Sequence, residues 1–266
     1  MPDTQQSRDH RGLAIDQVGV CDLRYPITVL DRANRQQQTV ATVSLSVSLP
    51  HHFKGTHMSR FVEVLNRHRG EITVRTLPAI LDEMKDKLDA ERAQIELRFP
   101  YFVEKAAPVT NATGLMDYAC SFVAEANGND HDFILEVEVP VMSLCPCSKQ
   151  ISDYGAHNQR GIIAIQIRTI HTTTGEPELV WIEELIELAE ASASAYPLLK
   201  RADKRHVTMQ SYDNPMFVED IVRNVAMRLN QDPRISWFHI RVVNQESIHN
   251  HSAFAYIEKQ KGCPEE

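Results

Sequence analysis

The chain has 266 residues, of which 42% are hydrophobic and 24% are charged, enough apolar material for one large or two small cores. Its net charge of −8 argues against non-specific nucleic-acid binding, which needs a basic surface. No apolar run approaches the roughly 18 residues of a membrane span, and the polar start lacks the core of a signal peptide. We therefore expect a globular cytoplasmic protein whose five cysteines stay reduced.

The predicted elements run through the same order twice. In the first half, strand patterns cover residues 25–32 and 39–49, helical patterns cover 59–68 and 77–92, and strand patterns return at 95–103 and 118–125. In the second half, strands are predicted at 133–142 and 161–170, helices at 181–195 and 215–229, and strands at 235–243 and 253–258. This order predicts an α+β fold with two antiparallel sheets, each covered on one face by a helix pair.

The repetition also predicts where the chain divides. A turn signal (NGND) at residues 127–130 separates the two halves. We expect an N-terminal tail over residues 1–20 and a C-terminal tail over 261–266. Between them we expect a first strand-strand-helix-helix-strand-strand unit over 21–127 and a second over 128–260.

A short cysteine-rich segment is the strongest chemical signal. Cys145 and Cys147 are closely followed by His157, and thiol and imidazole are ligands that zinc selects. A Cys-Pro-Cys triplet alone is explained by incidental thiols. However, His157 lies in a run, YGAHNQR, with almost no apolar side chains, unlike a core strand. Lys149 beside the thiols favours the thiolate, which binds metal or attacks carbon.

A second cluster, ESIHNH, lies near the C-terminus. In an extended chain His249 and His251 point to the same side, so the two imidazoles could be a pair of metal ligands or a pair that contacts a phosphate and a base; an exposed polar turn is the alternative. Glu219 is predicted in the first turn of a helix, where interaction with the helix dipole is a sufficient explanation for a carboxylate.

Cationic side chains indicate a possible phosphate site. His57, Ser59 and Arg60 lie in a glycine-containing turn (GTHMSR) that leads into a predicted helix, and helix N-termini bind phosphate. A helix cap with solvated charges explains the same residues, and the spacing of a P-loop is absent. Lys200 and Arg201 could add to such a pocket, although adjacent basic residues are often only surface.

Together these segments resemble the prokaryote-specific type IB GTP cyclohydrolase I family. The matching motifs are SLCPCSK, YGAHNQR, KGTHMSRF, YPLLKR, NP followed by FVED, and ESIHNHS, spread over residues 22–256. The resemblance implies two tandem tunnelling-fold units, assembly into homotetramers, and active sites at subunit interfaces. It also implies conversion of GTP and water to 7,8-dihydroneopterin triphosphate and formate, for folate or deazaguanine-modified nucleoside synthesis.

The resemblance also implies roles for individual residues. It implies a divalent metal, Mn²⁺, Zn²⁺ or Fe²⁺, with Cys145 and His157 among its ligands. The implied catalytic residues are the thiol Cys147 and the proton-transferring His249 and His251. The implied substrate-binding residues are Glu219 for the guanine, with His57, Ser59, Arg60, Lys149, Lys200 and Arg201.

The chain departs from the family pattern at one metal ligand. Family members usually read Leu-Leu-Lys-Arg-Pro-Asp-Glu-Lys, in which the glutamate binds the metal, but here Lys204 occupies that position. Met209 likewise stands where a glutamate is common. We therefore expect either that Asp203, Glu246 or His249 completes the coordination, or that the metal is held more weakly, with water in place of the glutamate.

Two other functions are compatible with parts of the sequence. A nitrile reductase of the same fold superfamily also uses a cysteine and a glutamate, with NADPH and no metal, but the histidine-rich second cluster argues against it. A non-catalytic metal-storage or redox protein would use Cys145 and Cys147. That interpretation leaves His57, Arg60 and Glu219 without a role.

Overall fold

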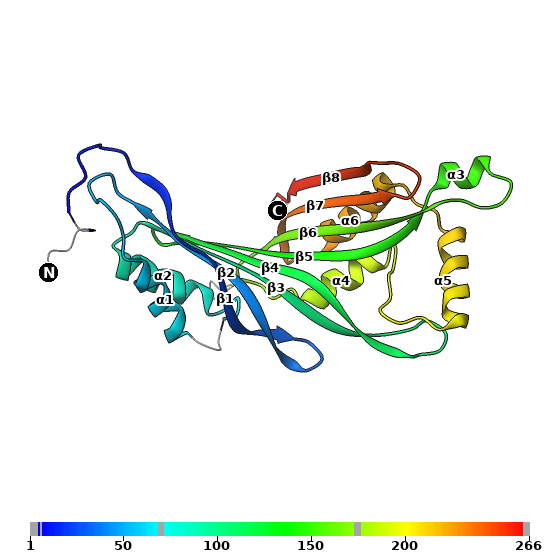
Figure 1. The fold of residues 1–266 in the computed structure, drawn as a ribbon, viewed down its shortest axis with the longest axis horizontal. Coiled ribbons are helices and arrows are strands. Elements are labelled where there is room, and N and C mark those ends of the chain that lie inside the picture. The colour runs from blue at the N-terminus through cyan, green and yellow to red at the C-terminus, as the bar shows by residue number, and fades with distance from the viewer. Residues whose placement is uncertain (1–4, 6, 69–71, 173–176, 263–266) are drawn as a thin grey trace. The chain divides into compact units, whose positions relative to one another are not determined.

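The computed structural model describes residues 5, 7–68, 72–172 and 177–262 (Figure 1). The elements within these residues are β1 (Ile15–Asp31), β2 (Arg35–Leu49), α1 (Met58–Arg67), α2 (Leu77–Leu88), β3 (Arg92–Ala106), β4 (Thr113–Asn127), β5 (Asp130–Leu144), α3 (Pro146–Ile151), β6 (Asn158–Thr169), α4 (Ile182–Glu190), α5 (Arg201–Asp213), α6 (Val218–Gln231), β7 (Ile235–Glu246) and β8 (Ser252–Gln260). No helix in this part of the chain is long and apolar enough to cross a membrane.

The eight strands form one sheet in which each strand pairs with its neighbours in sequence, from β1 to β8. The α+β class and the repeated element order are confirmed, but the prediction of two separate sheets is wrong. The pairing continues from β4 to β5 because the chain reverses tightly between them. Gly128 in this turn has a φ of 56°, which glycine adopts without steric cost.

The chain divides into two compact units, and each is described here by itself. Unit 1 comprises Met1–Pro100 and Cys120–Leu135. Its helices α1 and α2 pack on each other and on β1 and β2. Both helices present apolar side chains at helical spacing, and the buried ones are Phe61, Val64, Leu65, Leu77, Ile80, Leu81, Met84 and Leu88.

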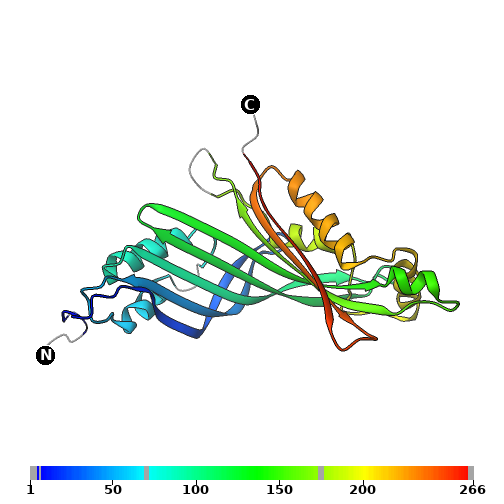
Figure 2. The same ribbon diagram turned by 90° about the horizontal axis from the view of Figure 1, so that it is seen from above.

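Unit 2 comprises Tyr101–Ala119 and Glu136–Glu266 and carries β6, β7, β8 and helices α3 to α6. Alternation in β6 buries Ile163, Ile165 and Ile167, and these pair across the sheet with buried residues of β7. Helix α6 packs on β7 and β8 (Figure 2, orange helix beside the orange and red strands). The core of unit 2 therefore lies between the helices and one face of the sheet.

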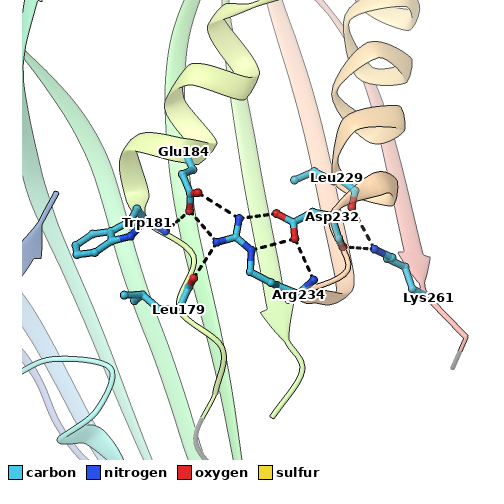
Figure 3. A network of polar contacts seen from close by, with 7 residues as sticks. All are labelled: Leu179, Trp181, Glu184, Leu229, Asp232, Arg234 and Lys261. Atoms are coloured by element: carbon cyan, nitrogen blue, oxygen red, sulfur yellow. Dashed lines mark hydrogen bonds and ion pairs between the residues drawn. The ribbon is translucent and has the colours of Figure 1, made fainter. Parts of the chain in front are cut away.

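Arg234, at the start of β7, joins the ends of two helices in unit 2 (Figure 3). Its guanidinium donates to both carboxylate oxygens of Glu184 on α4, each at 3.2 Å, and to Asp232 beyond the end of α6 at 2.7 and 3.1 Å. A further bond runs to the carbonyl oxygen of Leu179 at 3.0 Å. One side chain thus fixes α4 and α6 against the sheet.

Several boundaries differ from those predicted. The two compact units differ from the predicted division near residue 127, because β3, β4 and β5 each run through both units. Strand β1 begins at Ile15, inside the predicted N-terminal tail. Helix α2 ends at Leu88 because Asp89 has a left-handed φ of 51°, and α4 ends at Glu190. The short helix α3 and the polar helix α5 had no predicted counterpart.

Candidate active site

Cys145 lies at the start of α3, in the connection from β5 to β6 (Figure 1). Its backbone is extended, Pro146 takes the first helical position, and the Cys145 thiol accepts a hydrogen bond from the backbone N–H of Ser148 at 3.4 Å. The backbone N–H of Cys145 donates to the carbonyl oxygen of His157 at 3.1 Å. The two residues predicted as metal ligands are therefore held side by side. Cys147 is exposed on α3.

His157 lies just before β6, and Glu246 is the last residue of β7. Because β6 and β7 pair with Gln159 opposite Glu246, the carboxylate reaches the imidazole: Nδ1 of His157 is 4.0 Å from Oε2 of Glu246. Both side chains are largely buried, 13% and 10% exposed. Nδ1 of His157 has no hydrogen-bond partner among the described residues.

A chain of buried polar side chains lies behind Glu246. Gln159 donates from Nε2 to Oε1 of Glu246 at 2.6 Å, and its Oε1 accepts from Ser143 and Asn244, each at 3.0 Å. The amide of Asn244 also donates to Ser143 at 3.3 Å. Sequence analysis did not single out Gln159, Asn244 or Ser143. The signal was present, since the first two are polar residues at inward positions of strands that are otherwise apolar.

The two histidines of the second cluster lie in the turn between β7 and β8. His249 and His251 are exposed, and their rings stack with centroids 4.9 Å apart and planes at 14°. The turn begins directly after Glu246. The histidine pair therefore belongs to the same hairpin as the predicted carboxylate ligand.

The types of ligand at this site suit a divalent metal, although the described side chains do not converge on one point. Cys145, His157 and Glu246 combine thiol, imidazole and carboxylate, the ligand types of zinc and related ions, and Nδ1 of His157 is a buried atom without a partner. Within the described ranges, no three His, Cys, Asp or Glu side chains lie close enough together to hold an ion. The argument that a metal fits here therefore rests on the ligand types and on Nδ1 of His157, which has no hydrogen-bond partner among the described residues.

The contacts of Asp203 argue against the predicted metal-ligand role. Asp203 is fully buried, and it accepts from the backbone N–H groups of Val109, Thr110 and Lys200 at 2.9 Å and from the Thr110 hydroxyl at 2.6 Å. Burial raises the pKa of Asp203, but these hydrogen bonds together lower it well below its usual range. Asp203 instead caps α5 and ties this helix to the β3–β4 turn.

The basic residues around α5 have different surroundings. Lys200, Arg201 and Lys204 are exposed and thus accessible to an anionic ligand. Lys149 is engaged elsewhere in unit 2: its ammonium donates to the backbone carbonyl of Tyr212 and lies 4.3 Å from the centre of that ring. Its contacts favour a role in holding α5 to α3 over the predicted contact with substrate.

Glu219 is exposed in the first turn of α6. The backbone N–H of Phe217 at the start of this helix donates to the carboxylate of the neighbouring Asp220 at 3.1 Å. Because Asp220 provides the capping interaction, the Glu219 carboxylate is not needed for it. The explanation of Glu219 by the helix dipole still holds, and its exposure leaves the carboxylate accessible to a ligand.

The predicted phosphate-binding residues of the GTHMSR segment lie in unit 1. His57 directly precedes α1, and Ser59 is exposed in its first turn. Arg60 donates from Nη1 to the carbonyl oxygen of Lys87, at the end of α2, at 2.8 Å. Part of the Arg60 guanidinium therefore has a structural partner.

A cavity of about 220 Å³ lies in unit 2 beside the buried polar chain. It is lined by Met142, Ser143, Glu190, Ala191, Ser192, Ala193, Ser194, Val207, Gln210, Ser211, Asn214 and Met216. It is smaller than the roughly 300–1,000 Å³ of typical ligand pockets. This cavity alone does not provide a site for a whole nucleotide.

The chain is similar over nearly its whole length to known proteins. Residues 1–255 match the family model described as type I GTP cyclohydrolase folE2. A curated relative named GTP cyclohydrolase FolE2, from Syntrophus aciditrophicus strain SB, is 52% identical over 262 residues, covering 98% of this chain and 100% of that protein. The protein of the same name from Geobacter sulfurreducens is 52% identical over 263 residues, covering 98% and 99%.

Solved structures with a similar fold include urate oxidases. A highly active mutant of the enzyme from Bacillus sp. TB-90 has a TM-score of 0.59 at 10% identity, covering 93% of this chain and 100% of that chain. The enzyme from Bacillus subtilis 168 has a TM-score of 0.54 at 10% identity, covering 92% and 98%. At this identity the likeness shows the fold alone, and it confirms the expected tunnelling fold.

Proposed function

The chain belongs to the type I GTP cyclohydrolase family represented by FolE2, and from this membership we propose that it opens the imidazole ring of GTP to yield 7,8-dihydroneopterin triphosphate and formate. The match over residues 1–255 carries this proposal, and the family expected from the motifs is confirmed. GTP cyclohydrolase activity places the protein in folate and pterin biosynthesis. We further propose that the product also supplies deazaguanine synthesis and that the protein is cytoplasmic.

The proposed reaction is two hydrolyses followed by a ring closure. Water adds to carbon-8 of guanine and the imidazole ring opens to a formamide. A second water releases that carbon as formate. The ribose then rearranges, and closure of the pterin ring expels one water, so the net reaction consumes one water per GTP.

We assign the metal to Cys145, His157 and Glu246. Mn²⁺, Zn²⁺ or Fe²⁺ held there would act as a Lewis acid and lower the pKa of a coordinated water. The backbone bond between Cys145 and His157 and the 4.0 Å separation of His157 from Glu246 support this set. His249 could complete the set from the same hairpin, in place of the glutamate that the family usually carries at position 204.

The remaining site residues act on the substrate. Cys147, exposed on α3, would meet the purine as the catalytic thiol. His249 and His251 would transfer protons, since an imidazole can both accept and donate a proton. The Glu219 carboxylate would accept hydrogen bonds from the ring N–H and the amino group of guanine.

The triphosphate would lie against cationic and hydroxyl groups. The residues we propose for this are His57, Ser59 and Arg60, with Lys200 or Arg201. The family resemblance supports a site completed by a second copy of the chain. We propose a homotetramer with active sites at its interfaces.

The test is formate release from GTP by protein reconstituted with Mn²⁺, Zn²⁺ or Fe²⁺. We expect release by the wild type and by Cys21→Ala, because Cys21 is an exposed thiol in unit 1, and loss of release in Cys147→Ala. Full activity of Cys147→Ala would contradict the role of this thiol. Absence of formate with all three metals would contradict the function.

The same samples separate the other two functions considered from the sequence. A GTP cyclohydrolase gives a fluorescent pterin after oxidation of its product, whereas a nitrile reductase consumes NADPH and leaves GTP intact. A metal-storage protein binds metal without changing GTP. NADPH consumption with a deazapurine nitrile would favour the reductase.

A further inference from the structure

We propose that Gln159 is a positioning residue that holds the Glu246 carboxylate toward His157, and that Ser143 and Asn244 hold Gln159 in turn. This inference rests on the metal assignment within the proposed function. It concerns three residues to which the sequence analysis gave no role, although Ser143 and Gln159 lie within the motifs SLCPCSK and YGAHNQR.

The pairing of β6 and β7 sets up the contact. Gln159 and Glu246 are directly opposite partners in this antiparallel pair, so their side chains project from the same face of the sheet. Nε2 of Gln159 donates to Oε1 of Glu246 at 2.6 Å. That bond fixes one carboxylate oxygen, and the second, Oε2, is the atom that faces Nδ1 of His157.

The orientation of the Gln159 amide is determined by two donors on its far side. Oε1 of Gln159 accepts from the Ser143 hydroxyl and from the Asn244 amide, each at 3.0 Å. A flipped amide would direct its N–H groups at the N–H donor of Asn244 and its oxygen at the Glu246 carboxylate, losing the bonds to both residues, while the Ser143 hydroxyl would have to turn and accept. Ser143 and Asn244 therefore act as an orienting pair.

A neutral partner suits a carboxylate that must bind a cation. Arginine or lysine at position 159 would also hold Glu246, but its positive charge would repel a metal ion and compete for the carboxylate. An amide N–H restricts the rotation of the carboxylate and leaves its full negative charge available. The distance of 4.0 Å between Oε2 of Glu246 and Nδ1 of His157 is too long for a direct hydrogen bond.

Burying these three polar side chains would be costly if their only role were structural. Gln159 is 6% exposed, Ser143 4% and Asn244 0%. They lie at inward positions of β6, β5 and β7, and the inward positions further along these strands are mostly occupied by isoleucine or valine. Oδ1 of Asn244 has no hydrogen-bond partner among the described atoms, and an unsatisfied buried polar atom is destabilising. A hydrophobic residue would be more favourable there if stability alone mattered.

The backbone is also adapted to this arrangement. Gly161 is the partner of Asn244 across the sheet. A Cβ atom at position 161 would lie 2.3 Å from Oδ1 of Asn244, which no side chain tolerates. The absence of a side chain at position 161 is thus what allows Asn244 to reach Gln159.

The experiment is a titration of the full-length protein with Zn²⁺ in competition with a chromophoric chelator, without GTP. We expect Gln159→Met, which keeps the size of the side chain but cannot donate, to weaken Zn²⁺ binding by about 10–100-fold, the usual effect of losing a residue that orients a metal ligand. The matched control is Gln166→Met, because Gln166 lies on the opposite face of the same strand and should keep wild-type affinity.

A second variant keeps the proposal testable if Gln159→Met does not fold. Ser143→Ala removes one of the two donors that orient Gln159, and we expect a weakening of several-fold with an unchanged fold by circular dichroism. Wild-type Zn²⁺ affinity in both Gln159→Met and Ser143→Ala would overturn the proposal, as would failure of the wild type to bind Zn²⁺. Zn²⁺ binding with the expected losses but without formate release from GTP would support the positioning role and refute only the proposed function.

Discussion

Arg234 is the residue whose removal should destabilise unit 2 most clearly. Its side chain makes five hydrogen bonds, two to Glu184, two to Asp232 and one to the carbonyl of Leu179. The bonds from Arg234 lower the pKa of Asp232, and the bonds to Asp232 raise the pKa of Arg234, so both groups stay charged at neutral pH. Arg234→Ala would leave two carboxylates without their cation.

The exposed fractions of the three side chains determine how much stability the substitution should remove. Breaking a fully buried ion pair costs about 3–5 kcal/mol, whereas an exposed pair contributes about 0–1 kcal/mol. Arg234 is 32% exposed, Glu184 31% and Asp232 22%, which places the loss between these limits. We expect Arg234→Ala to lower the free energy of unfolding by about 2 kcal/mol, or the melting temperature by about 4–8 °C.

The assay is urea unfolding followed by tryptophan fluorescence. The chain has two tryptophans, Trp181 and Trp237, and both lie in unit 2. Arg234→Lys should recover only part of the loss, because an ammonium cannot form the paired bonds of a guanidinium.

The control for this experiment is Arg223→Ala on α6. Arg223 is 67% exposed and lies 3.8 Å from Asp220, so its loss should change the free energy of unfolding by less than about 0.5 kcal/mol. The reasoning is refuted if Arg234→Ala unfolds at the same urea concentration as Arg223→Ala.

Three further changes have defined outcomes. Lys204→Glu should tighten Zn²⁺ binding in the chelator titration, since it restores the usual family ligand; equal affinity would show that position 204 is outside the metal site. Gly161→Ala should lower the melting temperature, because its Cβ would meet Asn244, and an unchanged melting curve would contradict this packing. The pKa of Asp203 is lowered in the folded state, so its stabilisation is complete above about pH 4 and declines as the pH falls below that value. The stability difference between wild type and Asp203→Asn should therefore shrink on acidification, and a difference that grew would refute the assignment.

Hydrophobic periodicity predicted twelve of the fourteen elements, because their apolar faces are packed in a core. The other two helices lack that signal. Helix α5 buries only Asp203 and Val207, and α3 has six residues and buries none. Lys200 at the start of α5 is not one of the residues that signal a helix N-terminus, so the capping role of Asp203 has no sequence signature, whereas α3 depends on the Cys145 thiol and Pro146.

The sequence predicted the types of residue in the candidate site better than it predicted the contacts between them. The motifs grouped Cys145 with His157, and a backbone hydrogen bond joins these two residues, while the register of β6 and β7 brings Glu246 to His157. Asp203 looked like an available carboxylate in the sequence, but its four hydrogen bonds come from the distant β3–β4 turn and from its own helix. Side-chain partners that depend on tertiary contacts, such as Tyr212 for Lys149, have no local sequence signal.

The neighbour-to-neighbour order of the sheet has a consequence for how the protein is made. Each strand after β1 pairs with the strand that precedes it in the chain, so no strand has to wait for a partner that is synthesised later. The β1–β2 and β4–β5 hairpins close locally and can form early, whereas β3 and β7 pair only after the helices α1 and α2, or α4 to α6, have been made.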